Sequence, residues 1–202
     1  MKVNPDIFRQ YDIRGIADSD LDDTTILNLG RAFAAIAQVK LGLKNPPIGV
    51  VRDIRISRDR LFESLTDGLR DAGAHVVDLG MVPTPLVYFA RVELELDGCV
   101  QITGSHNPGE YNGFKMMMGK SSLYGDAVQE IRRRVEDGVP DAPGGELVDR
   151  PIQDAYVDYV AGNITLGARP IRLVADGGNV VGGPTAIALL GRPGRAVAPL
   201  YS

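Results

Sequence analysis

The sequence predicts an α/β fold, in which helices pack on a largely buried sheet. Short apolar runs alternate along the chain with longer segments whose apolar residues recur at helical spacing. The 24 glycines and 13 prolines fall between these segments and not in a low-complexity block, as is typical of turns. Strands that alternate with helices favour an α/β domain.

Residues 1–150 are expected to form one such domain. One of Asp22, Asp23 and Thr24 is expected to cap the first helix, and Gly42 to end it. Helices are predicted at residues 24–41, 57–72, 83–95 and 124–137, and strands at residues 48–51, 74–79, 98–103 and 113–118. The strand at 98–103 leads directly into the most distinctive segment of the chain.

Residues 151–202 are expected to hold a linking helix and the incomplete start of a second domain. The Gly- and Pro-rich residues 138–145 predict a connection. The elements expected after it are a helix at 152–162, a strand at 171–175, a glycine-rich turn at 176–183, a helix at 184–190 and a strand at 195–200. A β-α-β opening of this size cannot bury both faces of a sheet by itself.

Composition narrows the classes of function. A net charge of −4 and a pI near 5.2 give no electrostatic footprint for nucleic acid, so no nucleic-acid partner is expected. No apolar run approaches the length that spans a bilayer, so no membrane partner is expected. The polar N-terminal segment lacks a secretory apolar region, and the single Cys99 suits a reducing compartment. We therefore expect a cytoplasmic location.

The segment Thr-Gly-Ser-His-Asn-Pro at residues 103–108 offers the clearest candidate chemistry. It follows a predicted strand, and α/β proteins place ligands at the carboxyl ends of their strands. Ser105 is a weak nucleophile unless a base or a good phosphoryl donor assists it. His106 is adjacent, and Lys115 is a cation within reach if the loop doubles back. Asn107 stands where a hydrolase nucleophile elbow needs its second glycine, so that motif is excluded.

Four segments of the chain together resemble the α-D-phosphohexomutase family. Residues 103–108, followed by Tyr-Asn-Gly-Phe-Lys at 111–115, resemble its phosphoserine loop. The other three matches are Tyr-Asp-Ile-Arg-Gly at 11–15, Arg52-Asp53 with Arg55 and Ser57, and Gly-Met-Val-Pro-Thr-Pro at 80–85. Four matches in the family's order are hard to explain by chance. The resemblance implies the family's domain I, a mixed sheet sandwiched by helices, with residues 174–179 opening a similar second domain.

The resemblance implies a function and a role for five residues. Family members interconvert hexose 1-phosphates and 6-phosphates through a phosphoserine and a bisphosphorylated sugar. Ser105 would carry the phosphoryl group, and Arg14 and Lys115 would bind substrate and neutralise its charge. His106 would orient or deprotonate the sugar hydroxyl, with a purely structural hydrogen bond as the alternative. Tyr11 would shape the substrate pocket.

The resemblance also implies Mg²⁺, bound by a phosphate oxygen on Ser105 and by three aspartates of an Asp-x-Asp-x-Asp loop. That loop is absent from this sequence, so we expect no metal to be bound by this chain alone. The family uses a sugar 1,6-bisphosphate as activator. Arg52 and Asp53 are expected to form an ion pair that buttresses the serine segment, and His75 is expected to be structural.

Three interpretations stay open at this point. The chain is the truncated N-terminal part of a phosphomannomutase/phosphoglucomutase, acting on mannose and glucose phosphates, and is not competent alone. It belongs to a phosphoglucosamine mutase. Or it is a natural short protein that binds a phosphosugar or a protein partner without catalysis. In each case an unfinished sheet edge in the second domain would favour self-association.

Overall fold

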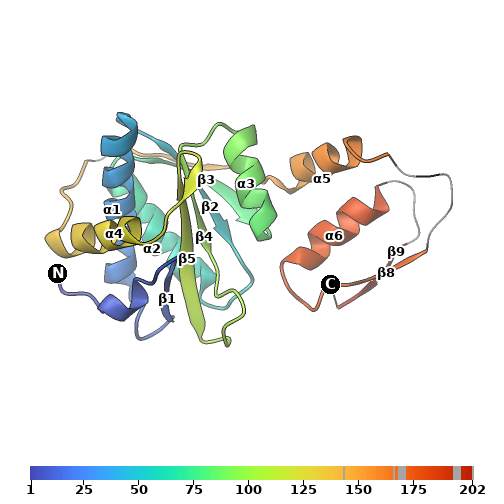
Figure 1. Cartoon of the computed structure of the whole chain (residues 1–202), viewed down its shortest axis with the longest axis horizontal. Coiled ribbons are helices and arrows are strands. Elements are labelled where there is room, and N and C mark those ends of the chain that lie inside the picture. Colours follow the sequence, from blue (N-terminus) through green and yellow to red (C-terminus); the bar gives the residue numbers. More distant parts are fainter. Residues whose placement is uncertain (143, 166, 168–171, 193–196, 202) are drawn as a thin grey trace.

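The computed structural model of the chain describes residues 1–142, 144–165, 167, 172–192 and 197–201. Its main body is a seven-stranded mixed sheet in the order β1-β5-β4-β2-β3-β7, with β6 paired to β5 (Figure 1). The strands are β1 (Ile13–Ile16), β2 (Pro47–Arg52), β3 (His75–Met81), β4 (Gly98–Ile102), β5 (Tyr111–Met118), β6 (Ser121–Ser122) and β7 (Leu147–Asp149). The predicted α/β class with a mixed sheet is confirmed.

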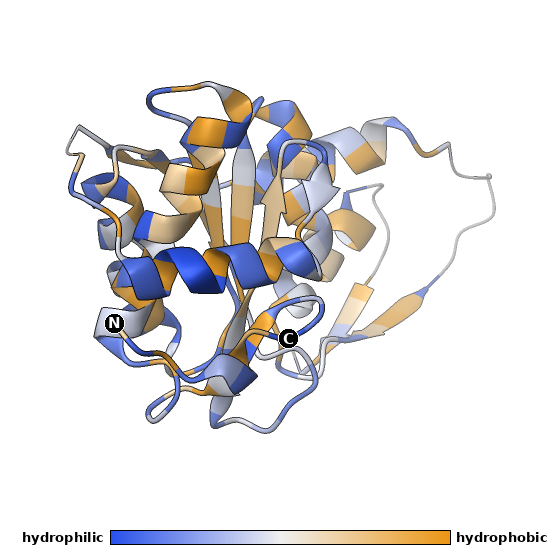
Figure 2. Cartoon of the chain, turned by 60° about the vertical axis from the view of Figure 1, so that its left-hand side comes forward, coloured by the Kyte–Doolittle hydropathy of each residue, from blue (hydrophilic) through white to orange (hydrophobic). Residues whose placement is uncertain are grey.

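Helices cover both faces of this sheet. The helices α1 (Asp23–Leu41), α2 (Arg58–Asp71) and α4 (Asp126–Asp137) lie on one face, and α3 (Thr84–Glu93) lies on the other (Figure 1). A short 3-10 helix, η1 (Pro5–Ile7), precedes β1. The hydrophobic residues gather on the strands between these helices (Figure 2). Phe33, Leu65 and Ile131 pack in the larger core cluster, and Leu86 packs with Leu79 and Cys99 in the smaller one.

Burial makes Cys99 chemically inert. Its side chain is fully buried, and this burial raises the pKa of the thiol to about 12, although a hydrogen bond from the backbone of Gly49 and the charge of Arg91 act in the opposite direction. The thiol therefore stays protonated at neutral pH and serves as a small apolar side chain of the core.

Parallel pairing brings the ends of β2 and β4 together. The two strands run side by side in register, with Arg52 opposite Ile102. The loops that follow them, at residues 53–57 and 103–110, consequently leave the sheet at the same edge. The carboxyl edge of parallel strands is the usual place for ligand sites in α/β proteins.

Residues after 150 form a smaller set of elements beside α3 (Figure 1). They are α5 (Gln153–Gly162), β8 (Leu173–Asp176), α6 (Gly182–Gly191) and β9 (Val197–Leu200), and β8 pairs with β9 in parallel. Phe89 of α3 packs against Tyr156 and Tyr159 of α5, with ring centroids 5.4 and 5.3 Å apart. The predicted starts of the last two strands, at residues 171 and 195–196, lie outside the described residues. The division into domains at residue 150 stays a prediction.

Three strands were not predicted. β1 overlaps the motif at 11–15 and has no apolar alternation that would reveal a strand, while β6 and β7 are only two and three residues long and exposed. The predicted strand at 113–118 begins two residues earlier, and the predicted helix at 124–137 begins at Asp126. None of the described helices is both long and apolar enough to span a bilayer.

Replacement of Gly68 by alanine is expected to destabilise the domain. A Cβ atom there would lie 1.9 Å from the carbonyl oxygen of Leu27, where α1 and α2 cross backbone to backbone. Such overpacking costs on the order of 2 kcal/mol or more. Urea denaturation measures the loss in the free energy of unfolding. Gly162→Ala is the control, since no atom lies within 4 Å of a Cβ there, and its stability should be unchanged or slightly raised.

Replacement of the helix cap Asp22 is expected to weaken α1 in a pH-dependent way. Burial acts to raise the pKa of Asp22, but hydrogen bonds from the Thr25 hydroxyl (2.6 Å) and the Thr25 backbone N–H (2.9 Å), with further backbone bonds, hold the pKa below its usual 3.8. The carboxylate therefore stabilises the fold above about pH 3.8, and this contribution is lost as the pH falls further.

Asp22→Ala should accordingly lower the free energy of unfolding by about 1 kcal/mol at pH 7, and by less at pH 3. Asp22→Asn, which keeps an acceptor oxygen, should retain most of the stability at pH 7. A loss for Asp22→Ala that is equal at both pH values would contradict the ionised cap.

Candidate functional site

The candidate site consists of two adjacent loops at the carboxyl edge of the sheet. Residues 103–110, named the serine loop, follow β4, and residues 53–57 follow β2. Both loops are anchored at their first residue, because Asp53 N–H donates to the carbonyl of Ile102 (3.0 Å) and Thr103 N–H donates to the carbonyl of Gly113 (2.9 Å). The loops are therefore fixed relative to each other where they begin.

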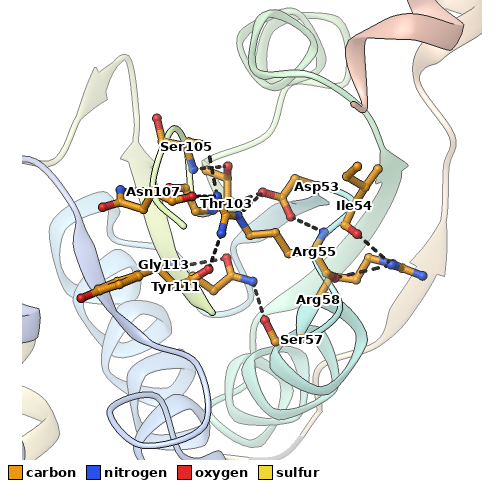
Figure 3. A network of polar contacts seen from close by, with 12 residues as sticks. Asp53, Ile54, Arg55, Ser57, Arg58, Thr103, Ser105, Asn107, Tyr111 and Gly113 are labelled. Atoms are coloured by element: carbon orange, nitrogen blue, oxygen red, sulfur yellow. Dashed lines mark hydrogen bonds and ion pairs between the residues drawn. The ribbon is translucent and has the colours of Figure 1, made fainter. Parts of the chain in front are cut away.

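Arg55, in the loop after β2, holds the serine loop in place. Its guanidinium donates to four backbone carbonyls, those of Pro108 (2.5 Å), Asn107 (2.6 Å), Tyr111 (2.7 Å) and Ser105 (3.2 Å). Figure 3 shows its side chain reaching from the loop after β2 toward these groups. A charged donor that makes several hydrogen bonds replaces the regular backbone pairing that a loop lacks.

Asp53 completes this arrangement. Its carboxylate accepts hydrogen bonds from the backbone N–H groups of Arg55 (2.9 Å) and Gly104 (3.1 Å), and it lies 3.5 Å from the Arg55 Nε. A Cβ atom on Gly104 would lie 1.9 Å from the Arg55 Cζ, so only glycine leaves room for the guanidinium. Asp53, Arg55 and Gly104 thus depend on one another through hydrogen bonds and close packing, and we name them the Arg55 unit.

Ser105 sits on the exposed side of this unit. Its backbone has φ +53°, a left-handed conformation that is uncommon for a residue other than glycine. Its N–H donates to the Thr103 hydroxyl (3.0 Å), while its side chain points away from Arg55 (Figure 3). Ser105 and the exposed His106 line a hollow of about 500 Å³, together with residues of the loop after β2 and with Val180 and Val181.

Arg14, on β1, contacts the backbone of the serine loop. It is only 3% exposed, donates to the carbonyl of Gly104 and forms an ion pair of 2.5 Å with Asp12. Its position on β1 is set by antiparallel pairing with β5, where Gly113 lies opposite. Arg14 is therefore an internal support of the loop, whatever it contributes to a ligand.

Tyr11 and Lys115 line a second hollow, of about 220 Å³, whose lining includes neither Ser105 nor His106. The Lys115 Nζ lies 3.4 Å from the Asp12 carboxylate oxygen that also contacts Arg14. Of the five residues predicted to act together, Ser105 and His106 share one hollow, and Tyr11 and Lys115 share another. Arg14 lies between them and contacts Gly104 and Asp12.

The expected ion pair between Arg52 and Asp53 is wrong. Arg52 instead pairs with Asp78 on β3 (2.6 Å) and its guanidinium lies 3.9 Å from the ring centroid of Phe62. Adjacent residues at the end of a strand point to opposite faces, so the two side chains diverge. His75 has the structural contact expected of it, because its Nδ1 accepts a hydrogen bond from the N–H of Glu146 (3.3 Å).

Metal binding gains no support from the described residues. No group of three or more His, Cys, Asp or Glu side chains in this part of the chain is placed to hold a metal ion. The residues present do not fit a Mg²⁺ site, so no chemical step is assigned to Mg²⁺.

Sequence reasoning missed the role of Arg55 and the partners of Asp53, although it included both in a motif and expected Asp53 to support the serine segment. Their partners are backbone groups, which leave no mark in the sequence. One signal was available, since residues 48–51 and 98–103 were both predicted as buried strands. Parallel pairing of these strands would have placed the two loops together.

Comparison with known proteins identifies the family. The model of phosphoglucomutase/phosphomannomutase, alpha/beta/alpha domain I, matches residues 5–140. The chain belongs to this family. It is 43% identical to a phosphoglucomutase of Neisseria gonorrhoeae, over 98% of this chain and 43% of that protein. It is 38% identical to a phosphomannomutase/phosphoglucomutase of Pseudomonas aeruginosa, over 96% of this chain and 41% of that protein.

A solved structure agrees with this assignment. The crystal structure of a phosphoglucomutase/phosphomannomutase family protein from Burkholderia thailandensis matches with a TM-score of 0.90 and 38% identity, covering 99% of this chain and 44% of that one. The resemblance to the phosphohexomutases and the domain I fold are confirmed. The chain spans about two fifths of the length of the relatives it matches.

Arg55→Lys is expected to loosen the serine loop without unfolding the domain. An ammonium group cannot reach four carbonyls at once, so the backbone N–H groups of residues 104–107 should exchange with solvent roughly tenfold faster or more. Hydrogen exchange followed by mass spectrometry measures this. Arg91→Lys is the control, because Arg91 donates to the carbonyl of Gly119 (2.7 Å), outside both loops. Unchanged exchange in Arg55→Lys would contradict the role of Arg55.

Proposed function

We propose that this chain is the phosphoserine-carrying part of a phosphohexomutase that interconverts the 1-phosphates and 6-phosphates of glucose or mannose. One observation carries the proposal. Ser105 is held in a left-handed conformation by the Arg55 unit, with its side chain directed away from that unit beside an open hollow. The names of the relatives, phosphoglucomutase and phosphomannomutase/phosphoglucomutase, supply the class of reaction.

Ser105 would act as the phosphoryl carrier. In the first half-reaction a sugar hydroxyl oxygen attacks the phosphorus atom on Ser105, the Ser105 Oγ–phosphorus bond breaks, and the sugar becomes bisphosphorylated. The Oγ of Ser105 then attacks the phosphorus of the other phosphate of the reoriented sugar, the sugar oxygen–phosphorus bond breaks, and the released sugar oxygen takes up the proton, which restores the phosphoserine. Because such transfers depend on positioning and charge neutralisation, a rigidly held serine suits this role.

His106 would accept the proton of the attacking sugar hydroxyl. It is exposed and lines the same hollow as Ser105, as a base for this step must. Arg14 would act indirectly, because it fixes the Gly104 carbonyl next to Ser105. Lys115 would balance negative charge on the bound sugar phosphate.

Turnover by the 202 residues alone is not part of the proposal. The chain matches only about two fifths of each relative's length, and its described residues offer no cluster of metal ligands. We propose that the complete activity uses further residues, with Mg²⁺ and a sugar 1,6-bisphosphate activator, in the cytoplasm. The lone buried Cys99 suits that compartment.

Incubation of the purified chain with glucose 1,6-bisphosphate and Mg²⁺ is expected to phosphorylate Ser105. Intact-mass and tandem mass spectrometry detect the added phosphoryl group and its position. Ser105→Ala should abolish the modification, whereas Ser121→Ala, at an exposed serine of β6 outside both hollows, should leave it unchanged.

Phosphorylation spread over several serines, or none with glucose 1,6-bisphosphate, would contradict the role of Ser105. An assay of glucose 1-phosphate and mannose 1-phosphate conversion complements this measurement. No turnover is expected from the chain alone. Turnover would show that 202 residues, singly or as an oligomer, assemble a complete site.

A further inference from the structure

The small sheet of β8 and β9 has an exposed apolar face. The two strands pair with each other in parallel, and no further strand of the described residues joins them (Figure 1). The helix α6 contacts both strands, while Val174 (68%) and Leu200 (46%) remain exposed. Parallel strands are normally buried on both faces, and an unpaired strand edge is a template for another strand. This sheet is therefore a candidate interaction surface.

The hydrogen-bond pattern identifies β8 as the strand with the open edge. The N–H of Gly177 donates to the carbonyl of Leu200 (2.9 Å). Because alternate residues of a parallel strand bond to the same neighbour, Pro199 directs its backbone to the outer edge of β9. Proline has no N–H group, so that edge is a poor template. By the same alternation, Val174 and Asp176 direct their N–H and C=O groups outward from β8.

The open edge of β8 carries a self-complementary row of side chains. Arg172, Val174 and Asp176 are all exposed, whereas Leu173 and Ala175 between them are half-buried, as side-chain alternation in a strand requires. A second copy rotated by 180° about Val174 supplies an antiparallel strand. Val174 then lies opposite its own copy, and Arg172 of each chain lies opposite Asp176 of the other. Opposite charges directly across an antiparallel pair stabilise it.

We infer that two copies of this chain associate through antiparallel pairing of β8 with β8, which forms a four-stranded sheet with a two-fold axis at Val174. The interface is isologous, so each contact occurs twice. The paired segment is short, and small interfaces are weak, so we expect a Kd on the order of 10 µM. The inference does not rest on the proposed function, and Ser105→Ala should dimerise like the parent.

Charge reversal tests the pairing, with sedimentation equilibrium as the measurement. The 202-residue protein is expected to change from monomer to dimer between about 1 and about 300 µM. Arg172→Glu places two carboxylates opposite each other, and Asp176→Arg places two guanidinium groups opposite each other. Each variant alone should raise the Kd at least tenfold. An equimolar mixture of the two variants restores both opposite-charge pairs and should form a heterodimer with about the parent Kd.

Two controls separate pairing from folding. Asp176→Arg also removes a hydrogen bond, since the Asp176 carboxylate accepts the N–H of Gly178 (2.9 Å). Arg172 has no hydrogen bond or ion pair among the described residues that Arg172→Glu could remove, so this variant should keep the melting temperature of the dilute parent. Arg133→Glu makes the same charge change at an exposed position of α4 and should keep the parent Kd.

A cysteine at the two-fold axis tests the register of the two strands. Directly opposite residues have Cα atoms about 5.5 Å apart, which a disulfide can bridge. Val174→Cys should therefore form a disulfide-linked dimer under mild oxidation with oxidised glutathione. Val92→Cys on α3 is the matched control, because Val92 is also 68% exposed, and it should cross-link at least tenfold more slowly. Cys99 is buried and does not compete.

Three results would overturn the inference. A protein that stays monomeric up to about 300 µM would show that β8 does not pair with a second copy, whatever else covers its edge. Dimerisation with an unchanged Kd in Arg172→Glu would place the interface on another surface. Equal cross-linking of Val174→Cys and Val92→Cys would exclude the two-fold axis at Val174.

Discussion

The guanidinium of Arg55 is the interaction on which the candidate site depends. A loop without regular secondary structure leaves its carbonyl groups without partners, and four such groups of residues 105–111 converge on this one cation. Gly104 lacks a side chain where the guanidinium passes, and Asp53 balances the charge while it binds the Gly104 N–H. The left-handed conformation of Ser105 is tolerable because these contacts on both sides of it restrict the backbone.

The sheet order is what makes this interaction available. The strands β2 and β4 are parallel neighbours, so Asp53 and the serine loop lie at the same edge of the sheet. The antiparallel pairing of β1 with β5 places Arg14 in contact with the carbonyl of Gly104 in that loop. The close crossing of α1 and α2 at Gly30 and Gly68 supports one face of that sheet. Packing far from Ser105 therefore determines how accurately its hydroxyl is presented, which links the hydrophobic core to the chemistry proposed for the site.

The sequence predicted the helices and the longer strands of the main sheet, and missed β1 and the short exposed strands β6 and β7. The helices and β2 to β5 have clear apolar periodicity, but β1 is a short strand that carries Arg14 and Gly15, and β7 is an exposed edge. The motifs located Ser105 and its neighbours, and the family followed from their order. The contacts of Arg55 could not be predicted because its partners are backbone carbonyls. The partner of Arg52 could not be predicted because it depends on the face of the sheet from which the Arg52 side chain projects.

One oxygen atom connects the two hollows. The same carboxylate oxygen of Asp12 contacts both Arg14 and Lys115, and Arg14 in turn holds the carbonyl of Gly104 next to Ser105. An anion that draws Lys115 toward itself would leave Asp12 to Arg14 alone and strengthen that ion pair. Asp12 and Arg14 thus link the hollow that Tyr11 and Lys115 line to the backbone carbonyl next to Ser105 through a continuous chain of polar contacts.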